Sequence, residues 1–232
     1  MATIAQDAIN FIEANKDHFD KNAHEYDEQP YALERARRTA IKMREAYDFK
    51  EDITTVLDLP NKVDLPIVGV DISQGMVDQY NLRVRNQGIP PEEMQAFRAE
   101  LKGEAGELGD EKFDVIICAS AYHHFPDIDA VTRILTHFLK YGGVFLVVDL
   151  AKRTGEHAHE QGHAHEHHQL IPDHVHHIVP HRGGLGESDM RRAFESAGLN
   201  SFSFDDSLVA KHDSRLFIAK GIKSRAQCQL MA

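Results

Sequence analysis

Two aspartates stand near the ends of two neighbouring apolar runs, VLDL with Asp58 and IVGVD with Asp71. Short runs of Val, Ile and Leu between turn residues are typical of buried parallel strands. Open α/β sheets bind ligands beyond the carboxyl ends of their strands. A carboxylate that ends the second strand of a nucleotide-binding unit can accept two hydrogen bonds from a ribose diol. The two acids therefore predict a nucleotide-type site at this edge of a sheet.

The link between these two runs is unusual for such a site. Residues 60–66 read PNKVDLP, with two prolines and no glycine. A nucleotide-binding unit normally has a glycine-rich turn and a helix here, and a parallel crossover needs about a dozen residues or more. We therefore expect that the two strands cannot both keep parallel places. Either the first strand shifts or pairs differently, or the core of the sheet is locally open.

Two adjacent histidines, His123 and His124, follow the clearest buried strand, FDVIIC. A neutral imidazole at the carboxyl end of a strand can accept a proton from a reacting group. The alternative is a pair that packs beside a ligand or caps the helix expected after Pro126. The structural alternative is favoured, so no catalytic residue is assigned and both histidines stay candidates.

A histidine-rich insert is expected at residues 155–182, where ten histidines fall between His157 and His181. Such spacings can ligate zinc, nickel or copper. No cysteine accompanies the run and no spacing fixes a tetrahedral site, so no metal ligand is assigned. We expect adventitious zinc or nickel on this insert, or a surface loop that shapes access to a site. The candidate metal ligands are His157, His159, His163, His165, His167 and His168.

The elements that must position these residues alternate between strand and helix. Two amphipathic helices are expected within residues 1–50, as an N-terminal helical cap, and another from Gln74 to Asn86 with Ser73 as its N-cap. Further strands are expected near 94–101, 113–118 and 144–150, a helix at 126–139, a helix at 187–197 that Ser188 could cap, and a closing antiparallel hairpin. This order predicts one α/β domain over residues 1–232 with a mostly parallel sheet.

Composition excludes several classes of protein. The 232 residues carry a net charge of −11, which argues against a nucleic-acid surface. No run approaches 18 apolar residues, so no membrane span is expected, and the N-terminus has no basic region of a secretory signal. Cys118 and Cys228 lie far apart, which favours a reducing compartment. A cytoplasmic protein is expected, and its oligomeric state is left open.

Four motifs in order resemble the class I S-adenosylmethionine-dependent methyltransferases of the small-molecule type. They are VGVDISQGMVDQYN, FDVIICASAYHHF, LKYGGVFLVVDL and a final F-S-F…L-F-I-A hairpin, and the resemblance runs from about residue 19 to residue 220. It implies a Rossmann-like fold with helices on both faces and an antiparallel C-terminal hairpin. It also implies S-adenosylmethionine as cofactor and a small-molecule acceptor.

The resemblance assigns cofactor-binding roles by position. Asp71 would bind the ribose hydroxyls, and Tyr26 would be the N-terminal aromatic that closes over the cofactor. Asp58 matches the acid that precedes the family's glycine loop. The other implied contacts are Ile72 and Met76 on the adenine side, Glu100 and Leu101 after the third strand, and Ala119 and Ser120 beside the methionine portion.

The segment after Asp58 departs from the family pattern, because none of the glycines of D/E-x-G-x-G-x-G is present. The backbone amides and helix N-terminus that would hold the cofactor's carboxylate end are therefore missing. Three hypotheses stay open. The chain is a methyltransferase, a non-catalytic protein or incomplete isoform of that fold, or a histidine-rich metal-binding protein.

Overall fold

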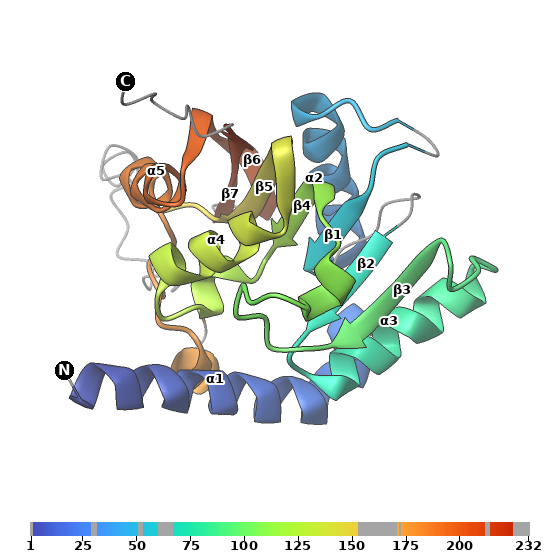
Figure 1. Cartoon of the computed structure of the whole chain (residues 1–232). Coiled ribbons are helices and arrows are strands. Elements are labelled where there is room, and N and C mark those ends of the chain that lie inside the picture. Colours follow the sequence, from blue (N-terminus) through green and yellow to red (C-terminus); the bar gives the residue numbers. More distant parts are fainter. Residues whose placement is uncertain are drawn as a thin grey trace, which may run out of the picture.

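The computed structural model describes residues 2–28, 32–50, 53–59, 67–152, 171, 173–211 and 214–224. Seven strands form one sheet in the order β3-β2-β1-β4-β5-β7-β6 (Figure 1). The first five are parallel, and β7 runs antiparallel to both β5 and β6. Their bounds are β1 Val56–Leu59, β2 Ile67–Asp71, β3 Met94–Arg98, β4 Phe113–Ala119, β5 Leu139–Leu150, β6 Leu199–Lys211 and β7 Ser214–Lys223. The expected α/β fold with its C-terminal hairpin is confirmed.

Helices cover both faces of this sheet. Buried side chains of α2 and α3 pack on one face, and those of α4 and α5 pack on the other (Figure 1). The bounds are α1 Ala2–Asn22, α2 Ala32–Ala46, α3 Gln74–Asn86, α4 Ile128–His137 and α5 Glu187–Ser196. Short 3-10 helices are η1 Ala23–Glu28, η2 Glu107–Asp110, η3 Tyr122–His124 and η5 Asp173–Ile178. Since Met43 of α2 lies in the core, only α1 of the two N-terminal helices lies outside the layers.

The ends of two helices show how local chemistry sets their boundaries. Ser73 caps α3 as expected, because its hydroxyl accepts the Met76 amide at 3.1 Å. The expected cap of α5 at Ser188 is wrong. That helix begins after Gly186, whose amide donates to the Asp189 carboxylate at 3.1 Å, so Ser188 already lies inside the helix.

The expected displacement of the first strand is also wrong. β1 pairs in parallel with β2 on one side and with β4 on the other, with Val56 opposite both Ile67 and Val115. The reason is the length of β1. It has only four residues, about 13 Å at 3.3 Å per residue. The chain must therefore return only a short distance, which seven residues can span at up to about 3.3–3.6 Å each.

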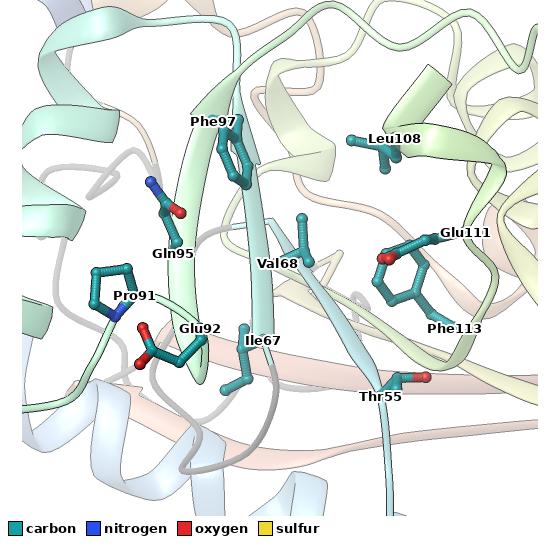
Figure 2. Close-up of a pocket in the computed structure, with 10 residues that line it drawn as sticks. All are labelled: Thr55, Ile67, Val68, Pro91, Glu92, Gln95, Phe97, Leu108, Glu111 and Phe113. Carbon is teal, nitrogen blue, oxygen red and sulfur yellow. The ribbon is translucent and has the colours of Figure 1, made fainter. Parts of the chain in front are cut away.

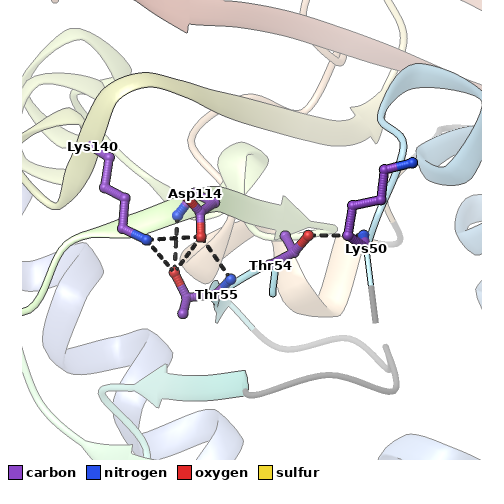
Figure 3. A network of polar contacts seen from close by, with 5 residues as sticks. All are labelled: Lys50, Thr54, Thr55, Asp114 and Lys140. Carbon is purple, nitrogen blue, oxygen red and sulfur yellow. Dashed lines mark hydrogen bonds and ion pairs between the residues drawn. The ribbon is translucent and has the colours of Figure 1, made fainter. Parts of the chain in front are cut away.

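A polar network fixes the entry of β1 against β4 (Figure 3). The Asp114 carboxylate accepts the amide of Thr55 at 2.9 Å, its hydroxyl at 2.8 Å and the Lys140 ammonium at 2.9 Å. Just before β1, the Thr54 hydroxyl accepts the amide of Lys50 at 2.9 Å. Burial opposes ionisation of Asp114, but the hydrogen bonds from Thr55 and Lys140 outweigh it and lower the pKa of its carboxyl. The network therefore anchors a short central strand at Thr55, the residue directly before it.

We expect Asp114→Asn to lower the free energy of unfolding by about 1–3 kcal/mol at pH 7, because it weakens three hydrogen bonds to one carboxylate. A carboxyl with a lowered folded-state pKa stabilises the protein above its unfolded pKa and loses that contribution as pH falls. The deficit should therefore shrink toward pH 3. Urea unfolding at pH 7 and pH 3 measures it. Glu34→Gln, which removes the exposed pair with Arg38, is the matched control. A deficit that is the same at both pH values would contradict this assignment.

Candidate functional site

The carboxyl ends of the parallel strands bring several predicted residues to one edge. Asp71 ends β2 and Ile72 follows it, Glu100 and Leu101 follow β3, and Ala119 ends β4 with Ser120 directly after it. Backbone hydrogen bonds hold neighbouring strand ends together. The Ala99 amide after β3 donates to the Asp71 carbonyl of β2 at 3.0 Å, and the Ser120 amide after β4 donates to the Val148 carbonyl of β5 at 2.8 Å. Ser120 adopts the left-handed conformation, with φ of 57°. The edge thus gathers the residues that the sequence placed there.

The carboxylate of Asp71 receives too few hydrogen bonds to offset the cost of burying its charge. Its Oδ1 accepts the Ser73 amide at 2.7 Å. Burial raises the pKa of Asp71 to about 6, and the nearby negative charge of Asp20 adds to this effect. Hydroxyl donors from a ligand would favour the ionised form. The local chemistry therefore fits a ribose diol.

The other predicted residues lie in different surroundings. Asp58 is fully buried, and the hydroxyl of Tyr80 lies 3.5 Å from its Oδ2. Met76 is buried in the first turn of α3, Glu100 is exposed, and Ile72 and Leu101 are half-buried. Tyr26 belongs to η1, but its side chain lies outside the described residues. The cofactor contacts assigned to these residues stay predictions.

Helix α1 crosses the carboxyl edge, which the sequence did not indicate (Figure 1). The Asp20 carboxylate accepts the Ser73 hydroxyl at 2.7 Å and the Gly75 amide at 3.0 Å. Further along the edge, the ring of Phe19 meets that of His124 with centroids 5.3 Å apart. An acid in the last turns of a helix is an ordinary surface feature, so no local signal identifies Asp20 as the residue that joins α1 to α3.

The two candidate histidines are held in different ways. His123 Nδ1 lies 2.6 Å from Asp149 Oδ1, whereas His124 Nδ1 lies 2.9 Å from the Ile178 carbonyl. Burial, together with the adjacent His123, lowers the pKa of His124 to about 4. Asp149 was missed by the sequence reasoning. The available signal was a charged residue inside the apolar strand VFLVVDL, because a buried acid needs a partner.

The candidate metal ligands His157, His159, His163, His165, His167 and His168 all lie outside the described residues. Among the residues that the structure describes, no group of three or more His, Cys, Asp or Glu side chains is placed to hold a metal ion. The metal-binding hypothesis therefore receives no support.

A pocket of about 640 Å³ lies at the other end of the strands (Figure 2). Its walls include Val68 at the start of β2, Phe97 of β3, Leu108 of η2 and Phe113 at the start of β4. None of the residues predicted to bind the cofactor lines it. The pocket is therefore separate from the candidate site.

Comparison with known proteins finds similarity to methyltransferases over part of the chain. Residues 51–145 match the family described as methyltransferase domain. An uncharacterized methyltransferase of Schizosaccharomyces pombe is 35% identical over 139 residues, which are 58% of this chain and 46% of that protein. The resemblance to the class I S-adenosylmethionine-dependent methyltransferases is confirmed. The chain spans about half the length of that curated relative.

Solved structures share this methyltransferase fold. Magnesium protoporphyrin IX methyltransferase of Synechocystis with bound SAH superposes with a TM-score of 0.60 and 13% identity, over 91% of this chain and 99% of that one. The cyclase SpnF superposes with a TM-score of 0.56 and 14% identity, over 81% and 80%. Because these identities are low, the likeness concerns the fold alone. Within the described residues, we find no helix with the length and apolar character needed to cross a membrane.

We expect protonation of His124 to destabilise the methyltransferase fold. Its pKa is about 4 in the folded protein against 6.5 ordinarily, so the unfolded chain binds more protons between these values. The free energy of unfolding should fall by up to about 3 kcal/mol as pH drops from 6.5 to 4. His124→Phe should flatten this dependence, with a residual slope from His18, whose pKa burial also lowers. Urea unfolding across the pH range measures it.

The exposed His24 provides the matched control, and His24→Gln should keep the slope of the parent protein. An identical pH dependence in the His124→Phe protein would show that His124 is not the group that titrates.

Proposed function

We propose that this chain transfers a methyl group from S-adenosylmethionine to a small-molecule acceptor. The observation that carries the proposal is Asp71 at the end of β2, a half-buried carboxylate whose raised pKa shows that its backbone donors do not offset burial, on the edge where the family fold binds its cofactor. The methyltransferase match over residues 51–145 supports it.

The residues that would hold the cofactor come from the ends of β2 and β4 and from the first turn of α3. Asp71 would accept hydrogen bonds from the ribose hydroxyls, and Ile72 and Met76 would contact the adenine side. Ala119 and Ser120, on the other side of β1, would lie beside the methionine portion. When bound, the cofactor supplies a methyl group on a positively charged sulfur. The role of the protein is then to place an acceptor in line with that group and to exclude water.

A second candidate rests on the link between β1 and β2. Residues 60–66 contain no glycine, so the amide-rich turn that would hold the cofactor's carboxylate end is absent from the sequence. A methyltransferase fold without cofactor would act as a binding or regulatory protein. The match to the cyclase SpnF supports the general point that this fold serves other chemistry. The small-molecule partner, the cytoplasmic location and the absence of nucleic-acid binding stay predictions.

Titration calorimetry with S-adenosylhomocysteine separates the two candidates. We expect heat with the parent chain and an affinity about 10- to 100-fold lower for Asp71→Asn, because hydrogen bonds to a charged group contribute about 1.5–3 kcal/mol. Affinity of the parent should also fall below pH 6, as Asp71 becomes protonated and can no longer accept two bonds. Asp78→Asn, an exposed acid on α3 that bonds only locally to Gln74, is the matched control.

No heat from the parent chain at any pH would reject the methyltransferase proposal and favour the binding protein. Equal affinities of the parent and Asp71→Asn would leave cofactor binding in place but remove Asp71 from it.

A further inference from the structure

A buried carboxylate fixes the orientation of His123. Asp149 of β5 is fully buried, and its Oδ1 lies 2.6 Å from His123 Nδ1. Its Oδ2 also accepts the His123 backbone amide at 3.2 Å, and its Oδ1 accepts the Leu150 amide at 2.6 Å. Burial opposes ionisation of Asp149, but the imidazole and these amides outweigh it and lower the pKa of the carboxyl. An ionised acceptor at Nδ1 requires the imidazole proton on that nitrogen.

The second ring nitrogen of His123 therefore carries a lone pair. Within the described part of the chain, Nε2 has no hydrogen-bond partner, and 11% of the side chain is exposed. His124 differs, because its Nδ1 faces a backbone carbonyl and no carboxylate supports its ring. Of the two adjacent histidines, only His123 combines an ionised partner on one nitrogen with an unengaged nitrogen on the other.

The position of His123 is fixed from several sides. It follows Ser120 at the carboxyl edge, and its carbonyl accepts the His181 amide at 3.3 Å. The preceding Tyr122 is fully buried and shares a hydrogen bond of 2.9 Å with Thr132. A ring held in this way needs little reorganisation when it accepts a proton.

We propose that His123 is the general base of the methyl transfer, positioned by Asp149, and that the acceptor is a small molecule methylated on a hydroxyl group. This rests on the proposed function. The hydroxyl proton moves to Nε2 of His123, and an oxygen lone pair forms the new bond to the methyl carbon. The bond from that carbon to sulfur breaks, and its electron pair neutralises the charge on sulfur.

The choice of a hydroxyl follows from acidity. A thiol ionises near pH 8.5 and an amine nitrogen has its own lone pair once deprotonated, so both become nucleophilic with little help. An alcohol or phenol stays protonated at neutral pH and needs a base during attack. An imidazole backed by a buried carboxylate is therefore most useful for a hydroxyl acceptor.

The test compares His123→Gln, Asp149→Asn and, as control, His137→Gln, at the far end of α4. Nitrogen-15 NMR of histidine-labelled protein reports the tautomer of His123, assigned from the signal lost in His123→Gln. Calorimetry with S-adenosylhomocysteine reports cofactor affinity. Methyl transfer is measured between pH 5.5 and 9 with two hydroxyl probes, catechol and 4-hydroxybenzoate, and one amine probe, benzylamine.

We expect the proton of His123 on Nδ1 and transfer to at least one hydroxyl probe. His123→Gln should lower kcat by about 10²- to 10⁴-fold and remove the rise of rate with pH, while the affinity for S-adenosylhomocysteine changes less than threefold. Asp149→Asn should shift the proton to Nε2 and lower kcat similarly. His137→Gln should match the parent. The titratable groups around the base are Asp149 behind it, His124 beside it and His18 of α1 beyond His124.

Three results would overturn the proposal while leaving the methyltransferase function intact. They are a proton on Nε2 in the parent, transfer to benzylamine alone, and a kcat for His123→Gln within threefold of the parent. Cofactor binding without transfer to either hydroxyl probe would overturn the assigned acceptor class. Absence of cofactor binding by the parent is a different failure, since it rejects the proposed function itself.

Discussion

The parallel pairing of β1 with both β2 and β4 is the constraint on which the site depends. Val56 lies opposite Ile67 and Val115, so Asp71 and Ala119, each four residues further along, reach the same level of the sheet. A shift of β1 by one residue would reverse the faces of its side chains. Val56 and Leu57 are fully buried in the cores on opposite faces, and the Thr55–Asp114 bonds fix the entry of the strand. A four-residue strand thereby sets the register of the whole edge.

Helix α1 covers this edge of the sheet and shields it from water. Its Asp20 binds the start of α3, its Phe19 contacts His124, and Asn15 donates to the Ile178 carbonyl at 2.9 Å. These contacts come from three separate segments, so α1 joins the end of β2 to the residues that follow β4 and to η5. The resulting burial keeps the imidazole of His124 neutral at physiological pH and strengthens the electrostatic interactions of the edge.

Much of this fold could be predicted from local patterns. The bounds of β1, β2 and α3, and the cap at Ser73, follow from apolar runs and turn residues that act over a few positions. The parallel pairing of β1 could not be predicted. The minimum length of a parallel crossover assumes a strand of ordinary length, and β1 has only four residues. Asp20 and Asp149 were missed for a different reason. Their partners lie 53 and 26 residues away, and no local spacing encodes such contacts.

Two carboxylates on the edge show how one physical effect leads to opposite chemistry. Burial opposes ionisation of both Asp71 and Asp149. At Asp149 the His123 ring and two amides reverse that effect, so its pKa is lowered and its charge orients an imidazole. At Asp71 the amide donors are too weak and Asp20 adds repulsion, so the pKa rises to about 6. A carboxylate in that condition gains most from hydrogen-bond donors that a ligand brings.

Groups whose surroundings drive their pKa values apart can serve different roles in one site. The fold alone does not create this difference, since it depends on the donors that each strand end receives from segments distant in sequence.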